Sequence, residues 1–279
     1  MVKGLKFWKM HGLGNDYIII DNTDEKLQGH NIGELARTLC QRRFSVGADG
    51  LILACKSNVA DVKMRIFNPD GSEAEMCGNG IRCLAKYCYE NSIIKKEAMT
   101  IETLAGIKQV WLRLKANGEV ETVKVDMGEP SFERKMIPMV GMGKCINEKL
   151  EVEGTIYNVT CLSIGNPHCT IFVDDVASVP LEKIGPKIEN HKMFPRRVNV
   201  EFIQVLSSNE IKVRVWERGV GETLACGTGA CASVVSGYVL GKTDKKVKVH
   251  LLGGNLEVFY DGRIYMEGPA TKVFVGELL

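Results

Sequence analysis

Long apolar runs and an excess of one charge are both missing from this 279-residue sequence. No segment approaches the length of a transmembrane helix, and the first residues contain no apolar core of signal-peptide length. The 36 Lys and Arg residues nearly balance the 34 Asp and Glu residues, and the basic residues are scattered. We therefore expect a cytoplasmic protein without a nucleic-acid or membrane partner.

Regular cysteine spacing is also missing. The ten cysteines include no pair with the two-residue separation of redox dithiols, and the five histidines are isolated. The pairs Cys83/Cys88 and Cys226/Cys231 are five apart, without a second ligand pair nearby. These features argue against a disulfide scaffold and against a structural metal. No lysine has the context of a Schiff base to pyridoxal phosphate, so we expect no cofactor.

Two short segments, 76–80 (MCGNG) and 225–229 (ACGTG), share the order cysteine, glycine, any residue, glycine. Each precedes a predicted helix, whose first backbone N–H groups and dipole favour a negative charge. The glycines leave room for a ligand to approach the backbone. We expect Cys77 and Cys226 to have lowered thiol pKa values and to transfer protons; a buried structural cysteine is the alternative.

The two motifs belong to a longer internal repeat. A shift of 149 positions aligns Lys63, Arg65, Glu73, Cys77, Gly78 and Gly80 with Lys212, Arg214, Glu222, Cys226, Gly227 and Gly229, without a gap. A shift of 151 aligns Gly14-Asn15 with Gly165-Asn166. Similarity in a fixed order at half the chain length indicates duplication into two domains. We expect one domain at 1–126 with a returning C-terminal strand at 271–279, and the other at 127–270.

Short β-rich stretches recur in both halves, and helices are few. The expected strands are 51–54, 62–67, 99–103, 109–115, 120–126, 157–163, 170–173, 200–206, 211–216, 247–251 and 256–260. A helical apolar stripe follows Gly80, and the run 230–240 is apolar or small on almost every face, so it must be enclosed. The predicted fold class is α+β: two pseudo-symmetric domains, each a curved, mostly antiparallel sheet or barrel around a central helix, with the active site in the cleft between them.

Two thiols on opposite sides of one substrate carbon could invert its configuration. One would remove a proton while the other supplies a proton to the far face. The helix N-terminus beside each thiol would hold a carboxylate next to that carbon and stabilise the negative charge that develops on deprotonation. This arrangement requires no cofactor.

Further polar residues flank the two motifs. His168 lies just before a predicted strand, where it could act in the site or merely form a local hydrogen bond. Glu217 and Arg218 follow the strand before the second motif. They could bind an amino acid, Glu217 contacting the ammonium group of the ligand and Arg218 its carboxylate, or they could form an exposed ion pair. Four asparagines in turn-compatible positions could line a polar pocket as a set: Asn15, Asn68, Asn166 and Asn199.

Four segments together resemble the diaminopimelate epimerase family: KMHGLGNDY from Lys9, FNPDGSEAEMCGNGIRC from Phe67, GNPHC from Gly165 and ERGVGETLACGTGACA from Glu217. They occur in the family's order and span nearly the whole chain. The resemblance implies cofactor-independent interconversion of LL- and meso-diaminopimelate, on the route to lysine and peptidoglycan precursors. It also implies a homodimer.

By the same resemblance, Cys77 and Cys226 correspond to the two catalytic bases, with His168 and Glu217 as flanking residues. The implied substrate-binding positions are Asn15, Asn68, Gly78, Asn79, Asn166, Asn199, Glu217, Arg218, Gly227 and Thr228. One departure is Gly50, where some members of the family carry glutamine.

Three other interpretations remain open at this point. A proline racemase-like enzyme would also use two cysteines as bases, but its first motif resembles Cys-Gly-His-Gly, whereas this chain has Asn79. A thiol redox protein would use Cys77 and Cys226 as a dithiol. A non-enzymatic binding module would not need the cysteines at all.

Overall fold

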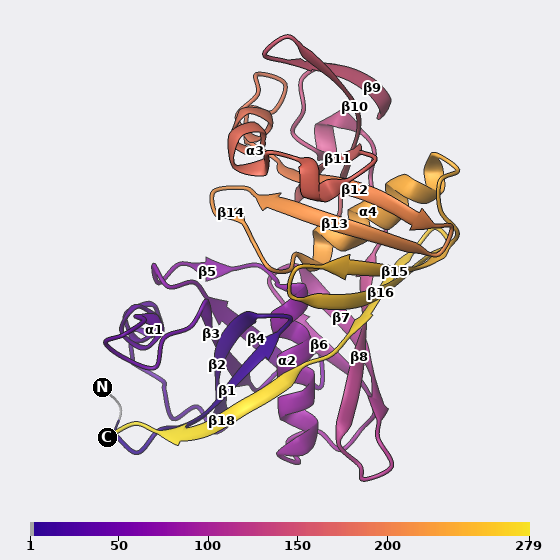
Figure 1. The fold of residues 1–279 in the computed structure, drawn as a ribbon. Helices are drawn as coiled ribbons and strands as arrows, with labels where there is room; N and C mark the ends of the chain where they lie inside the picture. Colours follow the sequence, from indigo (N-terminus) through magenta and orange to yellow (C-terminus); the bar gives the residue numbers. More distant parts are fainter. Residues whose placement is uncertain (1–2) are drawn as a thin grey trace. The chain divides into compact units, whose positions relative to one another are not determined.

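The computed structural model describes residues 3–279, which divide into two compact units. The first unit holds the residues up to Asp126 together with Glu267–Leu279, and the second holds Met127–Met266. Residues 267–270, which the sequence prediction assigns to the second half, group with the first. Each unit combines one mixed β-sheet with α-helices, so the predicted α+β class is confirmed (Figure 1).

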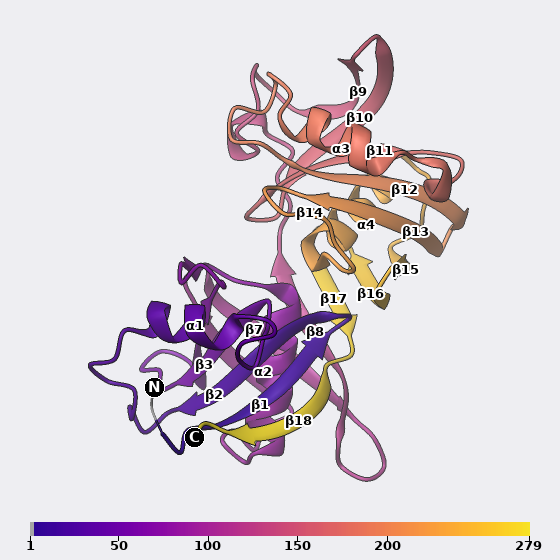
Figure 2. The same cartoon turned by 60° about the vertical axis from the view of Figure 1, so that its left-hand side comes forward.

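The first unit contains two helices and most of the N-terminal strands. Its elements are β1 (Lys6–Gly12), β2 (Asn15–Asn22), α1 (Ile32–Cys40), β3 (Gly50–Cys55), β4 (Val62–Phe67), β5 (Glu73–Ala74), α2 (Gly78–Glu90), β6 (Ala98–Thr103), β7 (Gly106–Leu114), β8 (Val120–Gly128) and β18 (Thr271–Glu277). The pairs β18–β1 and β1–β2 are antiparallel, β2–β3 is parallel, β3–β4 is antiparallel, β4–β6 is parallel, and β6–β7 is antiparallel. The C-terminal strand β18 thus lies beside β1 (Figure 2).

The second unit follows the same plan. Its elements are η1 (Arg134–Met136), β9 (Cys145–Val152), β10 (Thr155–Ser163), β11 (Pro167–Phe172), η2 (Val176–Ser178), α3 (Leu181–Glu189), β12 (Asn199–Ser207), β13 (Glu210–Glu217), β14 (Gly221–Glu222), α4 (Gly227–Val239), β15 (Lys246–Leu251), β16 (Gly254–Tyr260) and β17 (Ile264–Gly268). The pairs β9–β10 and β10–β11 are antiparallel, β11–β12 is parallel, β12–β13 is antiparallel, β13–β15 is parallel, and β15–β16 is antiparallel.

The two units therefore share one succession of strand pairings, which supports the duplication inferred from the sequence. The register repeats as well: Tyr17 pairs with Gly50 between β2 and β3, and His168 pairs with Asn199 between β11 and β12. One element departs from this correspondence between the two units. β9 precedes β10 in the chain, whereas its counterpart β18 comes from the C-terminal end.

Helices α2 and α4 are enclosed within their own units. α2 is buried from Gly78 to Cys88, and α4 is buried at almost every position from Gly227 to Gly237. α2 packs against β1, β2, β3, β4 and β7, and α4 packs against β10 to β13, β15 and β16. The enclosed helix predicted for the run 230–240 is confirmed. It begins three residues earlier, because the glycines of the motif already form the first turn.

Two features differ from the sequence prediction. Helices α1 and α3 were not predicted. α1 has a readable signal, since Asn31 caps it and Ile32, Leu35, Ala36 and Leu39 form its buried stripe, whereas Gly185 and Pro186 obscure the helical pattern of α3. Within residues 3–279 the strand pairings of each unit also form an open sheet, so neither unit closes into a barrel. No helix in this range is long and apolar enough to cross a membrane.

Gly185→Ala tests how tightly α3 packs on its sheet. A Cβ atom at Gly185 would lie 2.6 Å from Cγ and Cδ2 of Trp216, whose indole is held by a hydrogen bond from Nε1 to Glu189. We expect the variant to lose about 1–3 kcal/mol of the free energy of unfolding through overpacking. Urea unfolding measures this. Lys183→Ala, at an exposed position of the same helix, is the control and should change stability by no more than about 0.5 kcal/mol. Equal stability of both variants would contradict the packing argument.

Candidate functional site

Cys77 is the N-cap residue of α2, at the position that its glycine-rich turn predicts. Its Sγ atom lies 2.9 Å from Tyr17 Oη and 3.7 Å from Asn15 Oδ1. Tyr17 also donates to Asn15 Oδ1, and Asn79 Nδ2 donates to the same oxygen over 3.2 Å. Burial, and then the neighbouring Cys77 thiol, raise the pKa of Tyr17 well above its ordinary value. The phenol therefore stays protonated beside the sulfur.

Asn15 is held in place by a charged network at the start of β2. Its Nδ2 donates to Asp49 Oδ2 over 2.9 Å, and Arg42 bridges Asp49 and Asp16. Lys9 forms an ion pair of 2.6 Å with Asp16. Burial raises the pKa of Asp16, but the hydrogen bonds from Arg42 and Lys9 outweigh it and lower that pKa to about 2. The network thus remains ionised and fixes the amide that faces Cys77.

Cys226 is the N-cap residue of α4 and is 5% exposed. Its sulfur accepts from the Gly229 backbone N–H over 3.3 Å and lies 3.5 Å from Thr228 Oγ1. Burial, followed by the nearby Glu217 and Glu201 side chains, raises the pKa of Cys226 well above its ordinary value, although Thr228 and Gly229 act in the opposite direction. The prediction of a lowered thiol pKa is therefore wrong for Cys226, because desolvation outweighs the helix N-terminus.

His168 connects to Cys226 through two side chains. The imidazole is fully buried on β11, with Nδ1 2.6 Å from Glu201 Oε1 and Nε2 3.0 Å from Asn166 Oδ1. Asn166 Nδ2 donates to Thr228 Oγ1 over 3.1 Å. An unbroken series of contacts thus runs from Glu201 through His168, Asn166 and Thr228 to the sulfur.

The remaining predicted residues of the second unit surround the end of β13. Asn199 is buried; its Nδ2 donates to the Pro167 carbonyl, and its Oδ1 accepts from the Arg218 backbone N–H over 2.8 Å. Glu217 accepts from the Thr223 hydroxyl, and the Arg218 guanidinium donates to the Arg196 carbonyl. Asn199 thereby holds the backbone of the loop that carries Glu217 and Arg218.

The structure gathers the predicted residues into two groups, one in each unit. Cys77, Asn15 and Asn79 form the first, beside the helix start at Gly78. The second contains Cys226, Gly227, Thr228, Asn166 and His168. Asn68 stands apart on an exposed turn, where its side chain donates to Ser72 Oγ. Each group can offer amide donors, helix N–H groups and one thiol to a carboxylate-bearing ligand.

Sequence reasoning missed two residues that contact these groups. Tyr17 was not among the predicted site residues, and Glu201 lay only within the strand expected at 200–206. The strand pattern around Glu201 could have indicated its role. Side chains two positions apart on a strand share a face, and Glu201 shares its face with the buried Asn199 and Ile203. A carboxyl group on the inner face of a buried strand indicates a paired polar site. Among residues 3–279, no cluster of three or more His, Cys, Asp or Glu side chains could hold a metal ion.

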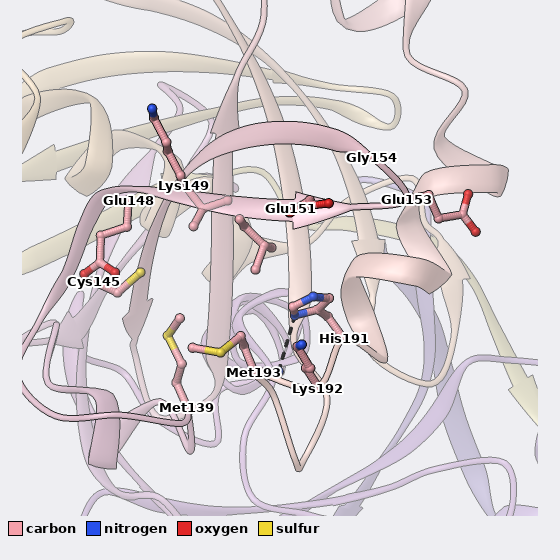
Figure 3. A pocket seen from close by; sticks show the side chains of 12 residues that line it. Met139, Cys145, Glu148, Lys149, Glu151, Glu153, Gly154, His191, Lys192 and Met193 are labelled. Atoms are coloured by element: carbon pink, nitrogen blue, oxygen red, sulfur yellow. Dashed lines mark hydrogen bonds between the residues drawn. The ribbon is translucent and has the colours of Figure 1, made fainter.

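A separate cavity of about 440 Å³ lies in the second unit, between β9 and the segment after α3 (Figure 3). Met139, Cys145 and Met193 line its apolar part, and His191 accepts from the Met193 backbone N–H. None of the predicted site residues lines this cavity. It is therefore distinct from the Cys226 group.

Solved structures of other proteins share the fold of this chain. A hydroxyproline epimerase from Agrobacterium vitis, with bound trans-4-hydroxy-L-proline, matches 99% of this chain over 93% of its own, with a TM-score of 0.71 and 13% identity. A PhzF-family phenazine biosynthesis protein from Bacillus anthracis matches over the full length of both chains, with a TM-score of 0.68 and 20% identity. The chain thus has the same fold as these proteins.

More closely related sequences identify the family. The family model for diaminopimelate epimerase matches residues 7–133 and 160–273. The diaminopimelate epimerase of Pelotomaculum thermopropionicum is 55% identical over 276 residues, 98% of each chain, and that of Moorella thermoacetica is 53% identical over 277 residues, 98% of this chain and 99% of the other. The chain belongs to the diaminopimelate epimerase family, and the resemblance seen in its motifs is confirmed.

Asp16→Asn should weaken the protein in a pH-dependent way. A carboxyl whose pKa falls from 3.8 to about 2 on folding adds stability that is complete above pH 3.8 and is lost as the pH falls to about 2. We therefore expect a lower free energy of unfolding than wild type near neutral pH, and a difference that shrinks toward pH 2. Chemical unfolding at the two pH values measures it. Asp24→Asn, in an exposed turn, is the control. A difference that is constant with pH would contradict the Asp16 network.

Proposed function

We propose that this protein epimerises LL-2,6-diaminopimelate to meso-2,6-diaminopimelate without a cofactor, using Cys77 and Cys226 as its two bases. One observation carries the proposal. Each of the duplicated units has a thiol at the same point, the N-cap of an enclosed helix. The Asn15 amide contacts Cys77, and the Asn166 amide reaches Cys226 through Thr228. The names of relatives at 53–55% identity agree with this activity.

The proposed mechanism needs one thiolate and one thiol at opposite faces of the substrate α-carbon. The thiolate removes the α-proton, and the thiol gives its proton to the other face, so the configuration inverts. Because burial raises the pKa of Cys226, Cys226 keeps its proton and delivers it in one direction of the reaction, while Cys77 acts as the base. The roles exchange in the reverse direction.

Binding of the amino-acid substrate is assigned to the polar residues around the two thiols. The proposed set is Asn15, Asn68, Gly78, Asn79, Asn166, Asn199, Glu217, Arg218, Gly227 and Thr228, with His168 and Glu217 flanking the bases. The first N–H groups of α2 and α4 would hold a carboxylate and stabilise the charge that develops at the α-carbon. Arg218 can bind a second carboxylate through its fork, and Glu217 an ammonium group. This division explains how a substrate with two amino-acid ends would be recognised.

The place of the enzyme in metabolism follows from its substrate. Diaminopimelate epimerisation serves lysine and peptidoglycan precursor synthesis, and we propose a cytoplasmic location for it. The net charge of +2, with scattered basic residues, supports a small molecule rather than a nucleic acid as the partner.

Removing either thiol should abolish turnover. We expect Cys77→Ala and Cys226→Ala each to reduce epimerisation of diaminopimelate by at least about a hundredfold, the lower range for loss of a general acid or base. The assay follows the change in optical rotation and the incorporation of solvent deuterium at the α-carbon. Cys88→Ala, which removes a buried thiol from the last turns of α2, should keep wild-type turnover.

Three results would overturn this assignment. Wild-type rates in both single variants would remove the two-thiol mechanism, whereas a wild-type protein without turnover would leave a binding module as the better interpretation. Turnover of free proline in place of diaminopimelate would favour the proline racemase-like alternative. The same deuterium assay distinguishes them.

We also propose that the protein forms a homodimer through β18. Val273, Phe274 and Val275 are consecutive and about half exposed, so β18 presents apolar side chains on both of its faces. Exposed apolar surface of this kind is typical of an interface. Val275→Lys should convert a dimer to a monomer in sedimentation experiments, whereas Thr271→Lys, exposed on the same strand, should leave the dimer intact. A monomeric wild-type protein would end this proposal.

A further inference from the structure

Glu201 is a buried carboxyl group that none of the proposed steps uses. Both Glu201 and His168 are fully buried, with Oε1 of the carboxyl 2.6 Å from Nδ1 of the ring. Within residues 3–279, Glu201 Oε2 has no hydrogen-bond partner. An unpartnered carboxylate oxygen costs far more in the interior than the carbonyl oxygen of a neutral acid. Burial, and to a lesser degree Glu217, accordingly raise the pKa of Glu201, although His168 opposes them. The 2.6 Å contact therefore holds one hydrogen, which Oε1 and Nδ1 share.

This proton determines which nitrogen of His168 carries a hydrogen. A neutral imidazole whose Nδ1 accepts a hydrogen bond has its own hydrogen on Nε2. The contact at the other side of the ring agrees, because Nε2 lies 3.0 Å from Asn166 Oδ1, which can only accept. A hydrogen on Nε2 therefore fits the contacts at both ends of the ring.

The hydrogen bonds keep the same donor-to-acceptor direction as far as the sulfur of Cys226. With its oxygen occupied by His168, Asn166 turns its Nδ2 toward Thr228 Oγ1, 3.1 Å away. The Thr228 hydroxyl accepts this bond, so its own hydrogen is available for Cys226 Sγ at 3.5 Å. If Nε2 carried no hydrogen, the Asn166 amide would turn over to donate to it. Its oxygen would then face Thr228, and the hydroxyl would donate away from the sulfur.

A comparison with the first unit shows why only the second unit needs the carboxyl group of Glu201. The repeat places Tyr17 where His168 lies, and Ile52 where Glu201 lies. A phenol has a single polar atom and donates to Asn15 without further help. Imidazole has two nitrogens and requires a partner that selects between its tautomers. The motif glycines fit these neighbours: a Cβ atom at Gly229 would lie 2.9 Å from Glu201 Oε1, and one at Gly80 would lie 3.0 Å from Ile52 Cδ1.

We propose that Glu201 is a positioning residue, which holds a proton at His168 Nδ1 and thereby directs a chain of hydrogen bonds through Asn166 and Thr228 onto the Cys226 sulfur. The inference rests on the proposed function in giving Cys226 a role in proton transfer, but the chain itself can be measured without substrate. The titratable groups that face it are His168 on β11, Glu201 on β12, Glu217 at the end of β13 and Cys226 at the start of α4.

The tautomer of His168 can be read directly from the full-length wild-type protein. In a sample labelled with ¹⁵N-histidine, long-range proton–nitrogen correlations show which ring nitrogen carries hydrogen, and His168→Gln assigns the signal. We expect hydrogen on Nε2. A His168 ring with a bare Nε2 would overturn the proposal, and this measurement requires no variant of Glu201 to fold.

The effect on Cys226 is measured by its rate of alkylation with iodoacetamide, resolved by mass spectrometry of the Cys226 peptide. Glu201→Leu leaves Nδ1 without its partner, and we expect alkylation at fixed pH to slow by about tenfold through loss of a hydrogen bond to the thiolate. Glu201→Gln can still donate to Nδ1, so its rate should stay within about twofold of wild type. Alkylation of Cys77 in the same samples is the internal control and should not change.

Two other outcomes of the alkylation experiment contradict the inference. Faster alkylation in Glu201→Leu would mean that Glu201 carries a negative charge that repels the thiolate. Equal loss in Glu201→Gln and Glu201→Leu would mean that proton donation to Nδ1 is not what matters. Absence of diaminopimelate turnover in the wild-type enzyme would remove the proposed function and leave the alkylation and tautomer results to decide the chain by themselves.

Discussion

The enclosure of one helix in each unit is the constraint on which the rest of the structure depends. α2 and α4 are buried over most of their length, so a sheet must surround each of them. Their first turns must then pack closely, and glycine is the residue that permits it: a Cβ atom at Gly80 or Gly229 would meet a buried side chain at 3.0 Å or less. The same turns expose helix N–H groups beside a cysteine. Packing of the core and chemistry of the thiols therefore have one structural origin.

The two units share this plan but provide different electrostatic surroundings for their thiols. Cys77 is partly exposed and lies against a tyrosine, whereas Cys226 is 5% exposed and lies near Glu217 and Glu201. Burial dominates at Cys226 and raises its pKa, although the helix N-terminus favours the thiolate. A duplicated fold thus supplies two thiols in different electrostatic surroundings.

Much of the fold could be predicted from local patterns. The strand predicted at 62–67 is β4 itself, and most others agree with the structure to within a few residues. Local patterns were insufficient for α3, where Gly185 and Pro186 lie in the helix because Leu181 and Ile188 bury its inner face. The cysteines and most of the polar residues around them could also be identified, because their motifs repeat. Asn68 was included with them, yet its side chain faces Ser72 on an exposed turn.

The sequence by itself determined the duplication, the family and the identity of the paired cysteines, because these depend on residue order and on spacings that no packing alters. The tertiary structure decided what surrounds each thiol. Glu201 and His168 are 33 positions apart and meet only because β11 and β12 pair in parallel with one register. The raised pKa of Cys226 likewise follows from burial among several elements. Desolvation and long-range hydrogen bonds sum over neighbours in space, and only the folded chain establishes which neighbours those are.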